Sequence, residues 1–234
     1  MKNSKNITIV IPAHNEEDSL PKLLPKLIKN GYEVILVDDG STDRTYEIAK
    51  RFCNVVRNKK RYGKGYALRM GFKEVNTLLI VMMDADLSHE ISDIQKLVNP
   101  LLKNKKIGLV IGSRGLGGSE EYTPSKTFGN IIITKFFNLF FNTHLTDSIN
   151  GFKALRKDIT KNLKCNGFNI EIELLGNCIR EGYTIYEVPS YEIARRAGKS
   201  KLNKIADGLS FLKQVFVEAY KSRGIQNKIL ILIR

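Results

Sequence analysis

Tryptophan is absent from this chain of 234 residues, and cysteine and histidine occur only three times each. The cysteines, Cys53, Cys165 and Cys178, are odd in number and form no Cys-x-x-Cys pair, which argues against a disulfide framework and a zinc knuckle. The histidines are scattered without metal-ligand spacing. Such cysteine usage suits a reducing compartment, so we expect a cytoplasmic protein.

Long apolar runs are also missing. The run that follows the polar N-terminal segment has five residues, Ile7–Ile11, which is too short for the core of a signal peptide. No stretch approaches the ~20 apolar residues that a membrane-spanning helix needs. The chain ends in an apolar segment, 229–233, which could be a last strand, a tail that touches a membrane or the stump of a truncated element.

Acidic residues are in the minority, with 24 Asp and Glu against 38 Lys and Arg, for a formal net charge of +14. This balance suggests an anionic partner, such as nucleic acid, a membrane surface or a phosphorylated small molecule. Hydrophobic residues make up 42% of the chain, which is enough for a full core. We expect one large domain over 1–205 and a C-terminal helix with an apolar tail over 206–234.

The first half of the chain alternates short apolar runs with segments of helical periodicity. The apolar runs predict strands over 7–11, 34–37, 77–83 and 107–111. Helical spacing predicts helices over 20–28, about 43–51 and 91–103. Nearly continuous apolar strands that alternate with helices predict an α/β fold, with a mostly parallel sheet covered on both faces. Ligands of such sheets bind beyond the carboxyl ends of the strands.

The second half is less regular. Segment 114–127 is rich in glycine, serine and charge and is expected to be a mobile loop. The Ile- and Phe-rich segment 131–141 either packs in the core or lies on a bilayer. Further on, the pattern predicts a helix near 169–182, a strand near 184–189 and a helix from about 201 to 222, with a basic loop over 195–201.

Acidic side chains follow three of the predicted strands. They are Glu16 and Glu17 after the first strand, Asp38, Asp39 and Asp43 after the second, and Asp84 and Asp86 after the 77–83 strand. So many carboxylates at one edge repel one another, and a divalent cation or a donor-rich ligand would relieve that cost. The Asp-x-Asp spacing of Asp84 and Asp86 suits one hard cation, whereas Glu17 or Asp43 alone could equally be a helix cap or turn residue.

Three motifs at these strand ends resemble those of the inverting nucleotide-sugar glycosyltransferases of family 2, which have the GT-A fold. They are Pro12-Ala13-His14-Asn15-Glu16, Asp38-Asp39-Gly40-Ser41-Thr42-Asp43 and Asp84-Ala85-Asp86. Later segments resemble the dolichol-phosphate mannosyltransferase branch of polyprenyl-phosphate glycosyl synthases. They are 61–65, 112–114, 147–152, 168–173 and 187–189, and the resemblance covers roughly residues 7–205.

The resemblance implies a GT-A-like, Rossmann-related domain whose donor site holds a nucleotide sugar. It assigns the base and ribose of the donor to Pro12, Asn15, Glu16 and one or both of Asp38 and Asp39. Asp84 would lie by the ribose and the metal, and Asp86 would ligate Mg²⁺ or Mn²⁺. Ser88 stands where the family often has glutamine, so its contribution would be weak or through water. The basic loop would bind the donor diphosphate through Arg196 and Lys199, with Arg195 as the alternative to Arg196.

The same resemblance places the acceptor phosphate on Arg114 and Lys126, with Arg114 and Asp86 as catalytic residues. A polyprenyl phosphate is mostly ionised at pH 7, because its second pKa is ~6. It therefore needs cations to position it and no general base. The metal and the basic loop would stabilise the charge that develops on the leaving diphosphate.

The sequence thus predicts hexose transfer from GDP-mannose or a UDP-hexose to dolichyl or polyprenyl phosphate, as in protein glycosylation. We expect a protein held peripherally at the cytoplasmic face of a membrane by C-terminal contact elements. One alternative is transfer to a sugar hydroxyl, which would need a catalytic acid among Glu120, Glu121 and Asp147. The absence of a Gln-x-x-Arg-Trp motif argues against a processive synthase. A non-enzymatic nucleic-acid-binding module is the alternative of another class, and no RNA motif or recognition helix supports it.

Overall fold

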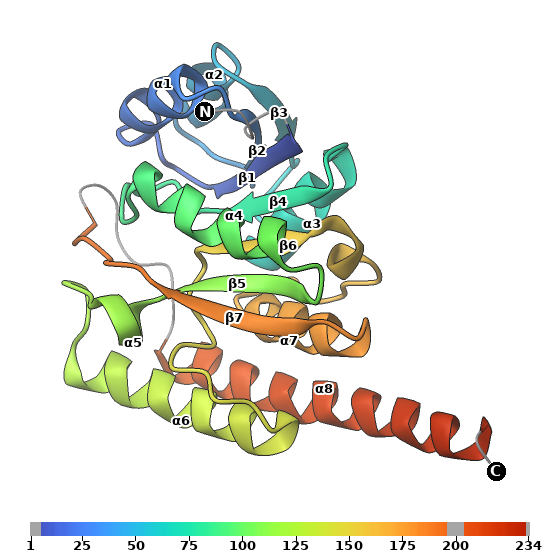
Figure 1. Ribbon diagram of the computed structural model, residues 1–234. Coiled ribbons are helices and arrows are strands. Elements are labelled where there is room, and N and C mark those ends of the chain that lie inside the picture. The colour runs from blue at the N-terminus through green and yellow to red at the C-terminus, as the bar shows by residue number, and fades with distance from the viewer. Residues whose placement is uncertain (1–5, 196–203, 233–234) are drawn as a thin grey trace.

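The computed structural model describes residues 6–195 and 204–232, with side chains described for 6–195 and 205–222. Within these residues, seven strands form one sheet in the order β3-β2-β1-β4-β6-β5-β7 (Figure 1). The strands are β1 Ile7–Ala13, β2 Glu33–Asp38, β3 Asn54–Arg57, β4 Leu79–Met82, β5 Ile107–Ser113, β6 Lys153–Arg156 and β7 Thr184–Pro189. Only β6 runs antiparallel to its neighbours in this described sheet, so the predicted mostly parallel α/β fold is confirmed.

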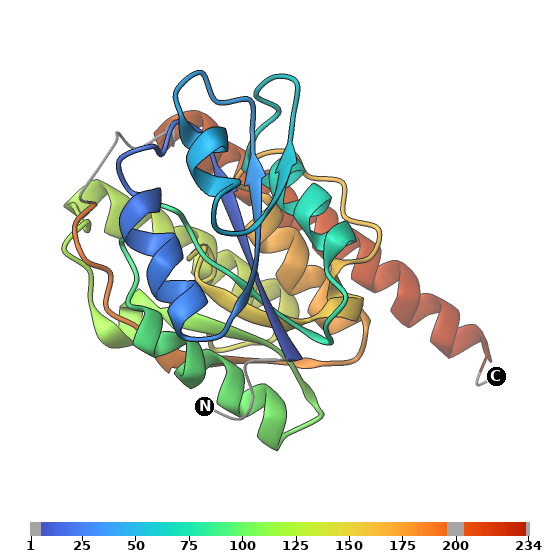
Figure 2. The same ribbon diagram turned by 90° about the horizontal axis from the view of Figure 1, so that it is seen from above.

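Helices cover both faces of the sheet, as Figure 2 shows from above. The helices are α1 Leu20–Lys29, α2 Thr45–Ala49, α3 Lys64–Glu74, α4 Ile94–Lys103, α5 Arg114–Gly117, α6 Pro124–Phe141, α7 Ile170–Arg180 and α8 Lys204–Leu232, with 3₁₀ turns η2 Ile91–Asp93 and η3 Lys157–Thr160. One core lies between the sheet and α1, α2 and α4. The other lies between the sheet and α3, α6, α7 and α8.

The central strand β1 is buried on both of its faces. Ile9 and Ile11 point into the core beneath α1 and α4, whereas Val10 points into the core beneath α3. All three are completely buried. A strand buried on both sides therefore reads as a continuous apolar run, which is typical of parallel sheets.

The structure differs from the prediction in segment 114–127, which was expected to be a loop. It contains α5 and the first turn of α6, where the Ser113 and Thr123 side chains accept backbone N–H groups as N-caps. Segment 131–141 lies within α6, and α6 packs along α8 (Figure 1). The C-terminal apolar segment is helical as far as Leu232, so the alternative of a last strand is wrong.

Helix α8 begins at Lys204, just before the expected domain boundary at 205/206. Its buried residues Phe211 and Val215 belong to the second core, and its C-terminal part projects beyond the body of the molecule (Figures 1 and 2). In the described part of the chain, no helix combines the length and the apolar character that crossing a bilayer requires.

Candidate active site

A pocket of about 460 Å³ opens at the carboxyl ends of the strands, where the sequence predicts the chemistry. The predicted site residues that line it are Pro12, Glu16, Asp39, Asp84, Asp86, Ser88, Arg114 and Lys126. Arg195, the alternative to Arg196, lines it as well. Asn15 and Asp38 lie outside the lining, and Arg196 and Lys199 lie outside the described residues.

Asn15 and Asp38 brace the turn that follows β2. The Asp38 carboxylate is completely buried, accepts the backbone N–H of Ser41 at 2.9 Å and forms an ion pair with Arg57 at 3.1 Å. Asn15 has a positive φ of 54° and accepts the backbone N–H of Thr42 with its side-chain oxygen at 2.9 Å. These contacts fix the shape of the β2 turn at the rim of the pocket.

Asp39 is the member of the Asp38-Asp39 pair that reaches the pocket. Its carboxylate accepts the Asn58 side-chain amide at 2.8 Å and the backbone N–H groups of Tyr62 and Gly63 at 3.0 and 2.7 Å. Asp39 therefore ties the segment before α3 to the end of β2. Of the two neighbouring acids, the geometry makes Asp39 the one that a donor in the pocket could contact.

Asp84 belongs to a chain of alternating charges. Its carboxylate pairs with Lys64 at 2.8 Å, Lys64 pairs with Glu171 at 3.2 Å, and Glu171 pairs with Lys153 at 2.6 Å. Burial raises the pKa of Asp84, but the Lys64 ammonium outweighs burial and holds that pKa below its ordinary value. Gly151 makes room for this row of charged side chains, because a Cβ there would lie 2.5 Å from Lys64 Nζ and 3.0 Å from Asp84 Oδ2.

Asp86 is paired with a different cation. Its Oδ2 atom lies 2.8 Å from Arg195 Nη2, and its Oδ1 atom accepts the backbone N–H of Ser88 at 3.1 Å. Within the described residues, no group of three or more His, Cys, Asp and Glu could hold a metal ion. Two carboxylates still fit Mg²⁺ or Mn²⁺, because such ions are commonly held by one or two carboxylates together with phosphate oxygens and waters of the substrate complex.

Arg114 is oriented by a buried acid. Its Nε and Nη2 atoms donate to Asp147 Oδ2 and Oδ1 at 2.7 and 3.0 Å, and its Nη1 atom lies 3.5 Å from Glu192. Asp147 is completely buried and also accepts the Asn130 side-chain amide at 3.0 Å. Burial raises the pKa of Asp147, but the Arg114 guanidinium more than offsets burial, so the pKa lies below its ordinary value.

Lys126 and Glu121 line the pocket near α6, and Glu120 lies next to Glu121 in the chain. Lys126 Nζ pairs with Glu121 at 2.8 Å, and this hydrogen bond holds the pKa of Glu121 below its ordinary value. Glu121 also accepts the backbone N–H of Arg195 at 3.1 Å, and Glu120 accepts that of Ala194 at 2.8 Å. The acids of this segment therefore hold the chain that follows β7.

The sequence motifs assign no role to three further charged residues at the site. Lys64 and Glu192 line the pocket, and Glu171 lies directly behind it, paired with Lys64. Lys64 and Glu171 fall in the segments 61–65 and 168–173, which carry the family resemblance. Their position in those segments was the available signal, but only the folded chain brings the two charges together.

Fold and pocket together define the class of protein: a glycosyltransferase with a GT-A-like fold. The family model described as "Glycosyl transferase family 2" matches residues 8–164, which is more than half of the chain. The chain belongs to that family. The alternative of a non-enzymatic nucleic-acid-binding module therefore has no support.

Two curated relatives resemble this chain over most of its length. The dolichol-phosphate mannosyltransferase of Pyrococcus furiosus is 34% identical over 218 residues, covering 84% of this chain and 59% of that protein. The dolichyl-phosphate beta-glucosyltransferase ALG5A of Trichomonas vaginalis is 29% identical over 207 residues, covering 78% of this chain and 64% of that protein. The chain thus spans less than two thirds of the length of each.

A solved structure supports the fold. Glucosyl-3-phosphoglycerate synthase from Mycobacterium tuberculosis, in complex with Mn²⁺, UDP-glucose and phosphoglyceric acid, matches with a TM-score of 0.73 and 22% sequence identity. The match covers 92% of this chain and 79% of that one. At this identity the likeness shows the GT-A-like fold, and the ligands belong to that protein.

Proposed function

We propose that this glycosyltransferase moves a hexose, with inversion, from GDP-mannose or a UDP-hexose to dolichyl or polyprenyl phosphate. The donor nucleotide would occupy the part of the pocket lined by Pro12, Glu16 and Asp39. Asp84 and Asp86 would hold Mg²⁺ or Mn²⁺. When bound, the cation would neutralise charge on the leaving diphosphate. The names of the two curated relatives support a lipid phosphate as the acceptor.

The observation that carries the proposal is the state of Asp147. This buried carboxylate accepts four hydrogen bonds, three from Arg114 and one from Asn130. A general base must reach the proton it removes and must have a pKa near the working pH. Asp147 has neither property. A phosphate acceptor needs no base, and its charge suits the cations Arg114 and Lys126 that line the pocket.

The other acids near the acceptor end are engaged as well. Glu120 and Glu121 accept backbone N–H groups of Ala194 and Arg195, and Glu121 also pairs with Lys126. Transfer to a sugar hydroxyl would require one of these acids to leave its partners. These contacts favour an acceptor that arrives already ionised.

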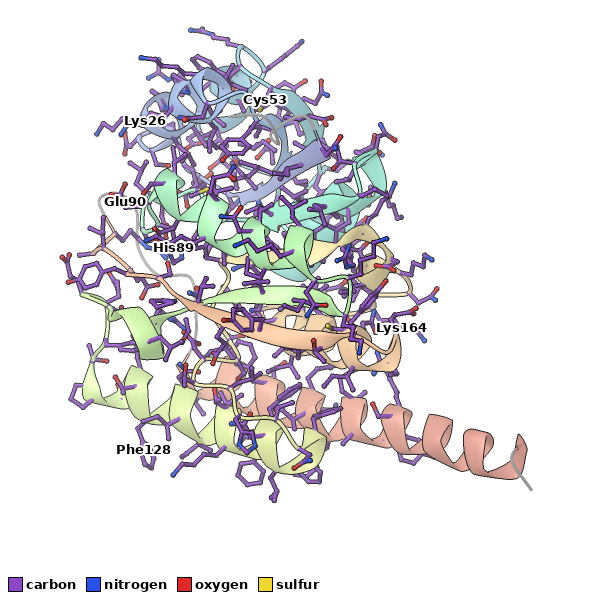
Figure 3. The ribbon with its side chains drawn as sticks, in the orientation of Figure 1. Lys26, Cys53, His89, Glu90, Phe128 and Lys164 are labelled. Carbon is purple, nitrogen blue, oxygen red and sulfur yellow. The ribbon has the colours of Figure 1, made fainter. Side chains whose placement is uncertain are left out.

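We further propose that the protein contacts the membrane through the outer surface of α6 and α8. The large apolar side chains exposed there are Phe128, Ile131, Phe136, Leu139, Ile205, Leu209, Phe216 and Tyr220. Phe128, labelled in Figure 3, projects from the outer side of α6. The pocket reaches these helices at Gly129, Ile133, Gly208 and Phe211. The hydrocarbon chain of a lipid whose phosphate lies at Arg114 could therefore extend out of the pocket along apolar side chains. Net charge of +14 favours an anionic leaflet.

A donor panel tests the proposed function. GDP-mannose, GDP-glucose, UDP-glucose and UDP-galactose are each incubated with a short polyprenyl phosphate and Mn²⁺, and products are read by mass spectrometry. We expect one donor to yield a hexosyl polyprenyl phosphate, with the matching polyprenol unreactive. Transfer to a free sugar, with none to the lipid phosphate, would overturn the proposal.

A further inference from the structure

The two carboxylates proposed to hold the metal each carry a basic side chain already. Lys64 Nζ lies 2.8 Å from Asp84 Oδ1, and Arg195 Nη2 lies 2.8 Å from Asp86 Oδ2. Both acids are thus neutralised by the protein's own cations. Because like charges repel, a divalent ion that reaches these oxygens must share the space with the two cations or replace one of them.

The two ion pairs differ in how firmly they are held. Lys64 is 12% exposed and has a second carboxylate behind it, Glu171 at 3.2 Å. Moving Lys64 away from Asp84 would also take its ammonium away from Glu171, whose side chain is only 1% exposed, and the loss of a counter-charge is costly for so buried an acid. The Arg195 side chain is 25% exposed, about twice as much as that of Lys64, so it has the easier access to solvent. The Asp86 side chain is only 7% exposed, so it needs a counter-charge, and a divalent cation that replaces Arg195 would supply it.

We propose that Arg195 is the exchangeable counter-cation of Asp86. A divalent cation binds by replacing the guanidinium on Oδ2, while Lys64 stays on Asp84. This inference rests on the metal site of the proposed function. A diphosphate in the pocket, or any other anion that draws Arg195 away from Asp86, would then increase the affinity for the metal. By linkage, the metal would increase the affinity for that anion by the same factor.

The test is Mn²⁺ affinity without nucleotide, measured from the free Mn²⁺ signal in electron paramagnetic resonance. Removing a competing, partly exposed ion pair in R195M should tighten Mn²⁺ binding roughly twofold to fivefold. K126M is the matched control: it also removes one positive charge from the pocket lining, but Lys126 pairs with Glu121 instead of Asp86. When Asp86 is replaced in D86N, the R195M change should no longer alter the Mn²⁺ affinity, which would show that Arg195 competes with Mn²⁺ at Asp86.

A second measurement uses the parent protein, in case R195M does not fold. With arginine labelled at ¹⁵Nε and the Arg195 signal assigned from R195K, titration with Mg²⁺ should shift that signal and leave that of Arg114 in place. Equal Mn²⁺ affinity of R195M and K126M would overturn the inference, and so would an Arg195 signal that ignores Mg²⁺. Absence of Mn²⁺ binding by every variant would overturn it too, whereas the proposed function is judged separately by lipid-phosphate transfer in the donor panel.

Discussion

Arg114 and Asp147 are joined by a forked pair of hydrogen bonds, Nε to Oδ2 at 2.7 Å and Nη2 to Oδ1 at 3.0 Å. The fork fixes the plane of the guanidinium and leaves its Nη1 edge on the side of Glu192, within the lining of the pocket. One contact therefore does two things. Under the proposed function, it orients a cation for an anionic acceptor, and it occupies the acid that a hydroxyl acceptor would need.

Asp86→Asn should keep the fold and lose most transfer activity, because the amide cannot serve as an anionic metal ligand. EDTA should abolish activity of the parent protein, and Mg²⁺ or Mn²⁺ should restore it. Thermal melting by circular dichroism checks the fold, and hexosyl lipid formation checks the activity. Full activity of the parent protein in metal-free buffer would contradict the metal site.

Gly151→Ala should impair the proposed metal site by displacing the Asp84 carboxylate, since the added Cβ would lie 3.0 Å from Asp84 Oδ2 and 2.5 Å from Lys64 Nζ. Lys64 is only 12% exposed and is held by Glu171, so its ammonium has little room to move away from the added methyl group. We expect weaker Mn²⁺ binding and at least a tenfold loss of transfer, about 1.4 kcal/mol in the barrier.

The matched control for this change is Gly208→Ala, because a Cβ at Gly208 meets nothing within 4 Å and alanine favours the helix. The control should melt at or above the temperature of the parent protein and bind Mn²⁺ as the parent does. If Gly151→Ala binds Mn²⁺ as tightly as Gly208→Ala, the position of the Asp84 carboxylate does not decide metal binding.

Leu139→Ser should weaken binding to anionic vesicles, because Leu139 is 77% exposed on the α6 surface proposed to meet the membrane. Leu78 is 78% exposed but lies next to β4, away from α6 and α8, so Leu78→Ser is a control of equal exposure. Vesicle sedimentation should also show release as salt rises, because salt screens surface charge. An equal loss of vesicle binding in both variants, or equal binding to neutral and anionic vesicles, would contradict the proposal that this surface of α6 contacts the membrane.

The Arg114–Asp147 pair should make the protein sensitive to acid. Since the folded pKa of Asp147 lies below its ordinary value, the pair stabilises the fold above the unfolded pKa of about 4 and loses this effect as pH falls through the folded pKa. The free energy of unfolding in urea should fall more steeply below pH 4 for the parent protein than for Asp147→Asn. Parallel slopes would show that Asp147 titrates normally in the fold.

Much of this architecture could be predicted because parallel strands buried on both faces have a strong signature. Ile7–Ile11, interrupted only by Thr8, and Ile107–Ile111, interrupted only by Gly108, are nearly continuous apolar runs, and both lie in strands of the sheet. β6 carries no such signature, since it begins with Lys153 and ends with Arg156. Lys153 is tolerated in the core only because Glu171 and the Asn150 carbonyl surround it, and sequence pattern cannot foresee that pairing.

The candidate site divides in the same way. Motif position and the rule for strand ends placed Asp39, Asp84, Asp86 and Arg114 at one pocket. The cations that neutralise Asp84 and Asp86 come from α3 and from the chain after β7, far away in sequence, so only tertiary structure reveals them. Asp38 points away from the pocket that Asp39 lines, because adjacent residues of an extended chain point to opposite sides, and its buried carboxylate pairs with the exposed Arg57.

In the proposed reaction the nucleophile is a phosphate oxygen held by Arg114, with no protein base. The most direct test compares kcat/KM of Arg114→Ala and Asp147→Asn with polyprenyl phosphate and with a free sugar as acceptor, across pH 5–9. We expect Arg114→Ala to lose roughly tenfold to a hundredfold with the lipid phosphate, the value of one charge-assisted hydrogen bond, at unchanged donor affinity. Asp147→Asn should retain more activity than Arg114→Ala. For the parent protein, kcat/KM should rise as the pH increases through ~6 and then stay constant past pH 8. Abolition of transfer by Asp147→Asn, with a mild effect of Arg114→Ala and a preference for the sugar, would contradict the account.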